Sequence, residues 1–276
     1  MRIDIVSLFP EFFDAFFSHS IIKRAIEAER LSMGVTNPRD FSHNKHGQVD
    51  DTPYGGGAGM LMMAPPIFEA VESVIAQYDS ETNSAYSTDE ICDEMSLIGN
   101  PSESIRRRVI FMGPTGQPFT QEKARELATY DQLVLICGHY EGVDYRVEEH
   151  LVDETISIGD YVLTGGELPA MVVADAVARM IPGVLGAASG AQEDSFYEPL
   201  LECPQYTKPP EFRGWGVPEV LRSGHHKNIA TWRQKQALKR TRLLRPDLLE
   251  RPLTKEEVKL LKEIIAEESE RDKSEV

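Results

Sequence analysis

The feature that most constrains this chain is a pair of apolar runs that each end in a glycine-rich loop. Residues 136–147 read ICGHYEGVDYRV and residues 157–171 read SIGDYVLTGGELPAM, with five glycines between them. Glycine at this density indicates backbone with positive φ or close approach of another group. Ligands of open α/β sheets bind beyond the carboxyl ends of the strands. The two loops therefore predict one concave binding pocket.

Short apolar runs alternate with helical spacing along the first two thirds of the chain. The sequence predicts strands at residues 3–9, 32–35, 109–112, 133–137 and 156–158, and helices at 11–31, 66–77, 120–129 and 168–181, with a polar loop at 37–51. This βαβ rhythm predicts an α/β domain with a largely parallel sheet.

The length and the cysteine pattern restrict the class of protein. A chain of 276 residues can form one large or two modest domains, and its apolar runs fall short of the roughly 20 residues of a membrane span. The start, MRIDIV, is typical of a strand and not of a signal peptide. Cys92, Cys137 and Cys203 are widely spaced and odd in number, so we expect structural thiols in a cytoplasmic protein without a membrane segment.

Composition changes divide the chain. Residues 77–105 are acidic and contain no basic residue before Arg106, so we interpret them as a surface insertion. Residues 182–218 are dense in Gly, Pro and Ser and mark a boundary, beyond which helices are predicted at 225–244 and 254–270. Thr254 and Glu257 form a capping-box pattern at the last helix. The predicted parts are a domain at 1–184, a linker at 185–217 and a helical domain at 218–276.

The charge distribution points in two directions. A net charge of −16 argues against a polyanionic partner. Residues 221–245, however, contain eight Lys and Arg residues and no acid, which favours phosphate binding over an ordinary solvated face. In this helix Ile229, Trp232, Leu238 and Leu243 are expected to pack inward while the cations face outward.

Three ionisable residues leave alternatives open. Glu141 in the first loop can reach a ligand or a cation, or can be a solvated loop acid. Arg179 lies on an almost apolar helix, where a structural pair with Asp175 is the simpler interpretation. Asp194, within EDSF, is by composition only another loop acid. The glycines of residues 55–59 are not followed by Gly-Lys-Ser/Thr, and no dinucleotide-binding fingerprint follows the first strand.

A series of longer motifs resembles one known family. The motifs are LFPEFF from residue 8, NPRDFSHNKHGQVDDTPYGGGAGMLMM from 37, the two loops above, RMIPGVLG from 179, EDSF from 193, ECPQYTKP from 202, SGHH from 223 and WRQKQALKRT from 232. Together they resemble the bacterial tRNA (guanine-37-N1)-methyltransferases of the SPOUT superfamily. The resemblance covers nearly the whole chain except the acidic insertion and the acidic tail.

The resemblance implies a fold that periodicity does not predict. SPOUT methyltransferases have a parallel sheet with a deep trefoil knot, followed in this family by a small all-helical C-terminal domain, and they are homodimers that share their active sites between subunits. S-adenosylmethionine would bind in the knot, where Gly138 and Gly165 would leave room for adenosine. The matching cofactor positions are Met112, Gly113, Pro114, Gly138, Tyr140, Gly142, Ile158, Gly159, Tyr161, Leu163, Gly165, Gly166 and Pro169.

The same resemblance implies a reaction at N1 of guanine 37, next to the tRNA anticodon. Asp194 would be the general base, Arg179 would stabilise charge on O6, and Glu141 would help to hold a magnesium ion. His139 stands where some members have arginine. The tRNA-binding residues would be Arg222, Lys227, Arg233, Lys235, Lys239 and Arg240. The alternatives are a knotted methyltransferase for another RNA position and a non-catalytic RNA-binding protein.

Overall fold

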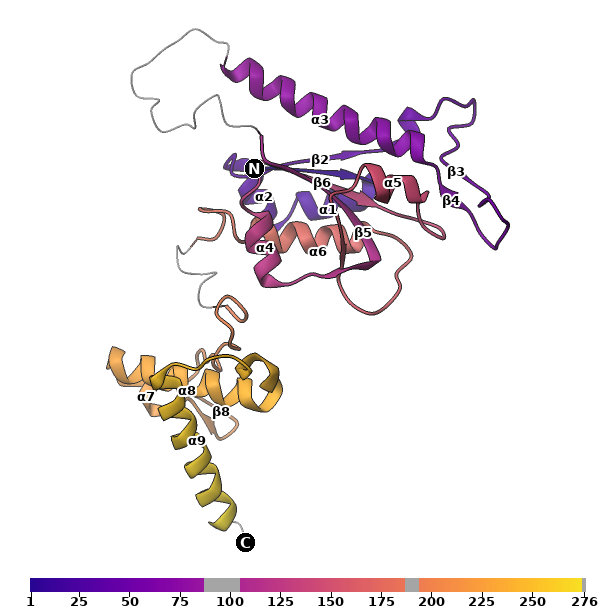
Figure 1. The fold of residues 1–276 in the computed structure, drawn as a ribbon. Helices are drawn as coiled ribbons and strands as arrows, with labels where there is room; N and C mark the ends of the chain where they lie inside the picture. Colours follow the sequence, from indigo (N-terminus) through magenta and orange to yellow (C-terminus); the bar gives the residue numbers. More distant parts are fainter. Residues whose placement is uncertain (87–104, 187–193, 275–276) are drawn as a thin grey trace. The chain divides into compact units, whose positions relative to one another are not determined.

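The computed structural model describes residues 1–86, 105–186 and 194–274 (Figure 1). The chain divides into two compact units, Met1–Ala188 and Ser189–Val276. Within the described residues, none of the helices has the length and apolar character that crossing a membrane requires. The sequence also predicts a separate linker at residues 185–217. That linker stays a prediction.

The first unit is built on a five-stranded sheet with the order β2-β1-β6-β5-β7. Its strands are β1 (Arg2–Val6), β2 (Ser32–Thr36), β5 (Arg107–Pro118), β6 (Gln132–Cys137) and β7 (Glu154–Ser157). Every pair of neighbours in this sheet is parallel, which confirms the predicted parallel sheet. A second, antiparallel pair joins β3 (Asp50–Asp51) to β4 (Leu61–Met62), inside and just after the predicted polar loop.

Helices cover both faces of the sheet (Figure 1). One face carries α3 (Ala64–Tyr86) and α5 (Tyr145–His150), and the other carries α1 (Asp14–Phe17), α2 (Ser20–Glu27), α4 (Gln121–Leu127) and α6 (Glu167–Ala178). The central strand β6 shows why. Leu133, Leu135 and Cys137 pack into the second layer, whereas Val134 and Ile136 pack into the first. A strand buried on both faces is an uninterrupted apolar run, as its sequence had indicated.

The single helix predicted at residues 11–31 is wrong. The segment forms a 3-10 helix, η1 (Pro10–Phe13), followed by α1 and α2. The hydroxyl of Ser18 donates to the carbonyl of Asp14 (2.7 Å), and Ser20 has a φ of 57°. A serine side chain that bonds a nearby carbonyl competes with the helix, and positive φ ends it. The polar loop at 37–51 likewise contains a 3-10 helix, η2 (Pro38–Phe41).

The predicted acidic insertion is partly helix. Residues 77–86 continue the helix α3 and are not part of a separate insertion. Two of their acids pair with arginines on strands: Glu81 lies 2.7 Å from Arg2 on β1, and Asp79 pairs with Arg107 on β5. These contacts between segments far apart in the sequence extend the helix. Residues 87–104, including Cys92, lie outside the described residues.

The second unit contains α7 (Glu219–Arg222), α8 (His226–Leu244), the 3-10 helix η3 (Pro246–Leu249) and α9 (Lys255–Ser274). Leu238, Leu260 and Ile264 form its small core. Leu243 is 78% exposed, so the prediction that it packs inward is wrong. An antiparallel pair of β8 (Glu211–Phe212) and β9 (Trp215–Gly216) also belongs to this unit, and it lies within the segment predicted as a linker.

The predicted capping box of α9 is confirmed. The Thr254 hydroxyl accepts from the Glu257 amide (3.2 Å), and the Glu257 carboxylate accepts from the Thr254 amide (2.7 Å). Arg251 donates a further bond of 2.6 Å to the same carboxylate. The hydrogen bond from the Arg251 guanidinium is the main reason that the pKa of Glu257 falls to about 2; burial opposes this shift, and the bonds with Thr254 add to it.

This depressed pKa predicts a pH-dependent stability of the second unit. The ionised Glu257 stabilises the folded unit above pH 4.5, and this contribution disappears as the pH falls towards about 2. Glu257→Gln should therefore lower the free energy of unfolding by about 2–3 kcal/mol at pH 7 and by little at pH 2. Thermal unfolding followed by circular dichroism at several pH values measures the difference. Glu256→Gln, on the same helical turn, is the control, and equal losses in both variants would contradict the argument.

Candidate functional site

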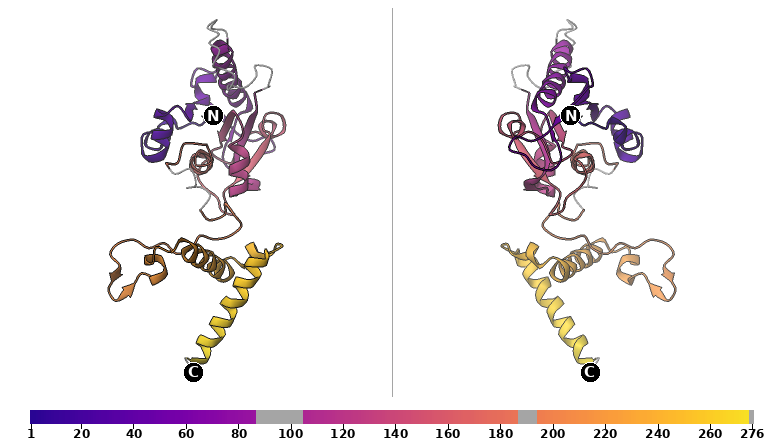
Figure 2. Two further views of the ribbon diagram at one scale, coloured as in Figure 1. Left: turned by 90° about the vertical axis from the view of Figure 1, so that its left-hand side faces the viewer. Right: turned by 90° about the vertical axis from the view of Figure 1, so that its right-hand side faces the viewer.

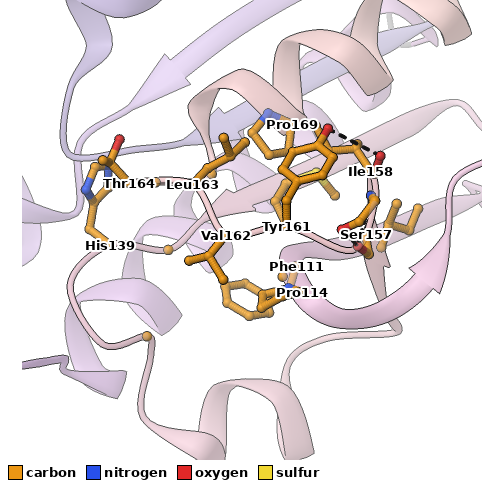
Figure 3. A pocket seen from close by; sticks show the side chains of 18 of the residues that line it. Phe111, Pro114, His139, Ser157, Ile158, Tyr161, Val162, Leu163, Thr164 and Pro169 are labelled. Carbon is orange, nitrogen blue, oxygen red and sulfur yellow. Dashed lines mark hydrogen bonds between the residues drawn. The ribbon is translucent and has the colours of Figure 1, made fainter.

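An open pocket lies at the carboxyl ends of β5 and β6 (Figure 3). Its walls come from three segments: the end of β5, the loop after β6, and residues 156–166 with the start of α6. All of the predicted cofactor positions line it, and so does Glu141. The sequence analysis missed further lining residues, although each lies within two residues of a predicted one: Phe111, His139, Ile156, Ser157, Val162 and Thr164.

Strand β5 opens to form one wall. Met112 and Gln117 both pair with Ile156 of β7, so residues 113–116 leave the ladder between them. Gly113 and Pro114 in this excursion line the pocket. An added Cβ at Gly116 would lie 2.5 Å from the Ile156 backbone nitrogen, so only glycine allows the strand to return to β7 here.

The loop at residues 157–166 folds back against the end of β6. Gly165 forms a β-bridge with His139, and a Cβ added to Gly165 would lie 2.3 Å from the His139 ring. A Cβ added to Gly166 would lie 2.6 Å from the Cα of Cys137. These glycines allow two parts of the chain to touch. Their role is thus contact within the chain, in addition to the space for a ligand that the resemblance implies.

The loop after β6 rests on the glycine loop at residues 55–59. The amide of Glu141 donates to the carbonyl of Met60 (3.1 Å), and the Glu141 side chain lies where a Cβ on Gly59 would be, 2.4 Å from its Cγ. Tyr140 has a φ of 59° and Gly142 one of 129°. The glycine loop that showed no phosphate-binding pattern therefore supports the backbone on which Glu141 is placed.

A buried carboxylate at the start of α6 connects this helix to the loop after β6 and to the segment after β1. Glu167, the first residue of α6, is 3% exposed. Its two oxygens contact different partners: the Ser7 hydroxyl beyond β1 donates to one (2.6 Å), and His139 Nε2 lies 2.7 Å from the other. His139 in turn packs edge-on against Phe9, with the ring centroids 4.8 Å apart. His139 is therefore held in place by contacts within the chain while it lines the pocket.

Most of the cations on the C-terminal half of α8 are not free. Lys235 pairs with Glu263 (3.6 Å) and Glu267 (2.6 Å), and Lys239 pairs with Glu268 (3.5 Å). Arg242 also pairs with Glu268, and Arg240 donates to the Glu202 carbonyl (3.2 Å). The prediction that these side chains face solvent is wrong for Lys235 because the acidic face of α9 covers it. Among the described residues, no carboxylate lies within ion-pair distance of Arg222, Lys227 or Arg233, which are exposed.

Comparison with known proteins decides the family. A family model described as tRNA (Guanine-1)-methyltransferase TrmD matches residues 1–251. The chain belongs to the TrmD family. A tRNA (guanine-N(1)-)-methyltransferase of Desulforamulus reducens is 55% identical over 96% of this chain and 95% of that protein. Proteins of the same name from Dehalococcoides mccartyi (strain CBDB1) and Pelotomaculum thermopropionicum are 50% and 52% identical, over 98% and 99% of this chain and 99% and 100% of their own lengths.

The three polar residues to which the resemblance assigns catalytic roles lie on different parts of the chain. Glu141 lines the pocket. Arg179 is the C-cap of α6, ten residues beyond Pro169, which lines the pocket near the start of that helix. At 1.5 Å per residue this separates the two by about 15 Å along the helix axis. Asp194 belongs to the second unit, where it lines a different pocket with Glu198 and Arg233.

The described part of the chain contains no group of three or more His, Cys, Asp or Glu side chains suited to a metal ion. Glu141 is therefore not part of a metal site made by protein groups alone. Cys137, beside the pocket, is fully buried, and burial raises the pKa of its thiol well above the usual value. Because the thiol stays protonated, it is neither a nucleophile nor a metal ligand. Cys203 is likewise a buried free thiol, which confirms the structural role predicted for both residues.

The contact between Gly166 and Cys137 predicts the effect of one added methyl group. Gly166 has a φ of −84°, which any residue adopts, so Gly166→Ala opposes the fold by crowding alone. We expect the free energy of unfolding to fall by about 1–3 kcal/mol and the affinity for S-adenosylmethionine to fall with it. Denaturant unfolding and calorimetric titration measure both. Gly186→Ala, which places a Cβ in open space, is the matched control. Identical behaviour of the two variants would refute the crowding argument.

Proposed function

We propose that this protein transfers a methyl group from S-adenosylmethionine to N1 of guanine 37 in tRNA, in the cytoplasm. One observation carries the proposal: the cofactor positions implied by the TrmD resemblance all line a single pocket of a chain that belongs to this family. Relatives that share its length and about half of its sequence are named tRNA (guanine-N(1)-)-methyltransferases.

The pocket suits S-adenosylmethionine. Its glycines expose backbone donors and acceptors, and Ile158, Leu163 and Pro169 supply apolar wall. A Cβ added at Gly142 would meet no atom within 4 Å, so the backbone there faces open space that a ligand can approach. The bound cofactor supplies a methyl group activated by a positive sulfur. The task of the protein is to hold that group in line with the attacking nitrogen.

The acceptor needs its own activation. Guanine N1 carries a proton, and its lone pair is delocalised until that proton leaves. Asp194 accepts the proton as general base, which requires hydrogen-bond distance to N1. Loss of the proton moves negative charge onto O6, and the fixed positive charge of Arg179 stabilises it there.

A site shared between two subunits explains the position of Arg179. An arginine side chain reaches far less than the roughly 15 Å of α6 that separates it from the pocket-lining Pro169. Arg179 of one subunit can serve the pocket of its partner in an antiparallel homodimer. We therefore include the homodimer in the proposal, with the pocket from one subunit and Asp194 from the other.

The trefoil knot is part of the same proposal. Two features support it. Residues 113–116 of β5 leave the ladder with β7, and residues 157–166 fold back against the end of β6. Magnesium is a further part. Among the described residues, Glu141 is not grouped with two other metal-ligating side chains, so a magnesium ion bound here would take most of its ligands from water and RNA oxygens. We assign no step of the reaction to it.

In this proposal the second unit binds the anticodon stem and loop of the tRNA. Of the six predicted tRNA-binding residues, Arg222, Lys227 and Arg233 are exposed and lack an ion pair among the described residues. Lys235 and Lys239 contribute less than the sequence predicts, since α9 already neutralises them. Phosphate contacts therefore concentrate on the first half of α8 and the residues before it.

Methyl transfer to transcripts tests the function directly. With labelled S-adenosylmethionine, we expect incorporation into tRNA transcripts that carry guanine at position 37 and none into transcripts with adenine there. Incorporation independent of that base would favour a knotted methyltransferase for another RNA position. No incorporation into any transcript, with tRNA binding intact, would favour the non-catalytic RNA-binding protein.

The general base is tested by Asp194→Asn. This variant keeps the size of the side chain but cannot accept the N1 proton, so turnover should fall by about 10²–10⁴-fold. Affinity for S-adenosylmethionine should not change, because Asp194 lies in the other unit from the pocket. Loss of cofactor affinity would instead assign Asp194 a structural role. Glu198→Gln, a nearby acid of the same unit, is the control.

The acidic face of α9 predicts a specific effect of charge removal. Replacing Glu263, Glu267 and Glu268 by glutamine frees Lys235, Lys239 and Arg242. We expect tighter tRNA binding at low salt and a salt slope steeper by about 2–3, because each phosphate contact contributes about 0.9. Exposed ion pairs add little to stability, so the fold should persist.

The control for this experiment changes Glu250, Glu256 and Glu270 to glutamine, which alters the net charge equally without freeing a cation. Filter binding across a salt series compares the two triple variants. If both bind tRNA alike, the cations under α9 do not face the RNA.

A further inference from the structure

The β8–β9 hairpin has a geometry that fixes two aromatic side chains side by side. Phe212 pairs directly with Trp215 across the hairpin. The two loop residues, Arg213 and Gly214, both have positive φ, at 55° and 81°. This is the pattern of a tight two-residue turn. Residues directly opposite each other in an antiparallel pair project to the same face, so the two rings share one face.

Both rings are left in water. Phe212 is 55% exposed and Trp215 is 69% exposed, with their centroids 6.2 Å apart. The Arg213 guanidinium lies over the Phe212 ring, 5.1 Å from its centroid. Burying such rings is favourable, and the hairpin does not bury them within its own unit. Two rings, tilted by 51° to each other, and one guanidinium therefore remain exposed.

The surroundings of the hairpin are cationic in an acidic chain. Residues 206–227 contain four Lys and Arg residues and only two acids, against a net charge of −16 for the whole sequence. Both views of Figure 2 place the β8–β9 pair on the opposite side of α8 from α9, within the second unit. The acids of α9 thus neutralise the other side of α8. The hairpin and the unpaired cations Arg222 and Lys227, which follow it in the chain, do not have such a cover.

We propose that Phe212, Arg213 and Trp215 form a platform on which an unpaired base of the RNA substrate stacks. Aromatic rings and the planar guanidinium are the groups on which proteins stack exposed bases, and the nearby cations suit the adjoining phosphates. Contact with a second copy of the chain would favour a purely apolar surface, whereas this one contains the Arg213 guanidinium. The inference rests on tRNA being the substrate, and it adds a contact away from the cofactor pocket.

Fluorescence of Trp215 tests the stacking itself. The chain contains two tryptophans, so Trp232→Phe leaves Trp215 as the single reporter. Stacking of a base on the indole quenches its emission, so we expect saturable quenching when tRNA transcript is added. A transcript that binds with unchanged Trp215 emission would overturn the platform. Failure of wild-type protein to bind any tRNA would instead count against the proposed function.

Affinity measurements on Trp215→Ala and Phe212→Ala give the energetic test. Loss of one stacked base should weaken the affinity for tRNA by roughly 5- to 150-fold, which corresponds to about 1–3 kcal/mol per base. The loss should be similar at low and high salt, unlike the loss of a phosphate contact. Ile265→Ala, which truncates an exposed apolar side chain of α9, is the matched control.

Sedimentation of the same variants tests whether the hairpin instead contacts a second copy of the chain. The platform proposal expects Trp215→Ala and Phe212→Ala to keep the oligomeric state and the S-adenosylmethionine affinity of the wild type. A shift to smaller species would assign the hairpin to contact with a second copy and overturn the proposal. Unchanged tRNA affinity in both alanine variants would overturn it as well.

Discussion

The contact of residues 157–166 with the end of β6 is the constraint on which the rest of the first unit depends. Gly165 lies against His139, and Gly166 lies against Cys137, at distances that exclude any side chain. Because the loop is pressed onto the strand end, α6 begins directly beside it and Glu167 reaches both Ser7 and His139. The pocket is the space that this return leaves between β5, β6 and the loop. Without the close contact there would be three separate loops and no common wall.

Much of this first unit could be predicted from local sequence. The run Leu133–Cys137 is apolar at every position, and such a strand can only be central, with helices on both sides. The glycine loops gave the edge of the sheet at which the pocket lies. The pocket residues that were missed, among them His139 and Thr164, carry no signal of their own beyond adjacency to the glycines. The cofactor and the knot came from the family resemblance, since a periodic pattern does not record how a chain is threaded.

Two of the errors have a common physical cause, which is pairing across long sequence separations. Residues 77–86 lack an apolar period, yet they are helical because Asp79 and Glu81 meet arginines on β5 and β1. The cations of α8 have no acid near them in the sequence, yet Glu263, Glu267 and Glu268 lie beside them in space. A run of cations in the sequence does not show which acidic side chains pack against it. Which charges remain available depends on the element packed against it.

In the proposed mechanism the two units supply different parts of the chemistry. The backbone around the pocket is held by parallel strands, glycine contacts and the buried Glu167, which suits a cofactor whose methyl group must point in one direction. The proposed base, Asp194, belongs to the other unit, together with the cations and the exposed hairpin that suit RNA. RNA bound to that unit would carry its guanine along with the group that deprotonates it. Because the proposed base and the pocket for the methyl donor belong to different units, deprotonation in this proposal depends on the RNA that brings the guanine to the base.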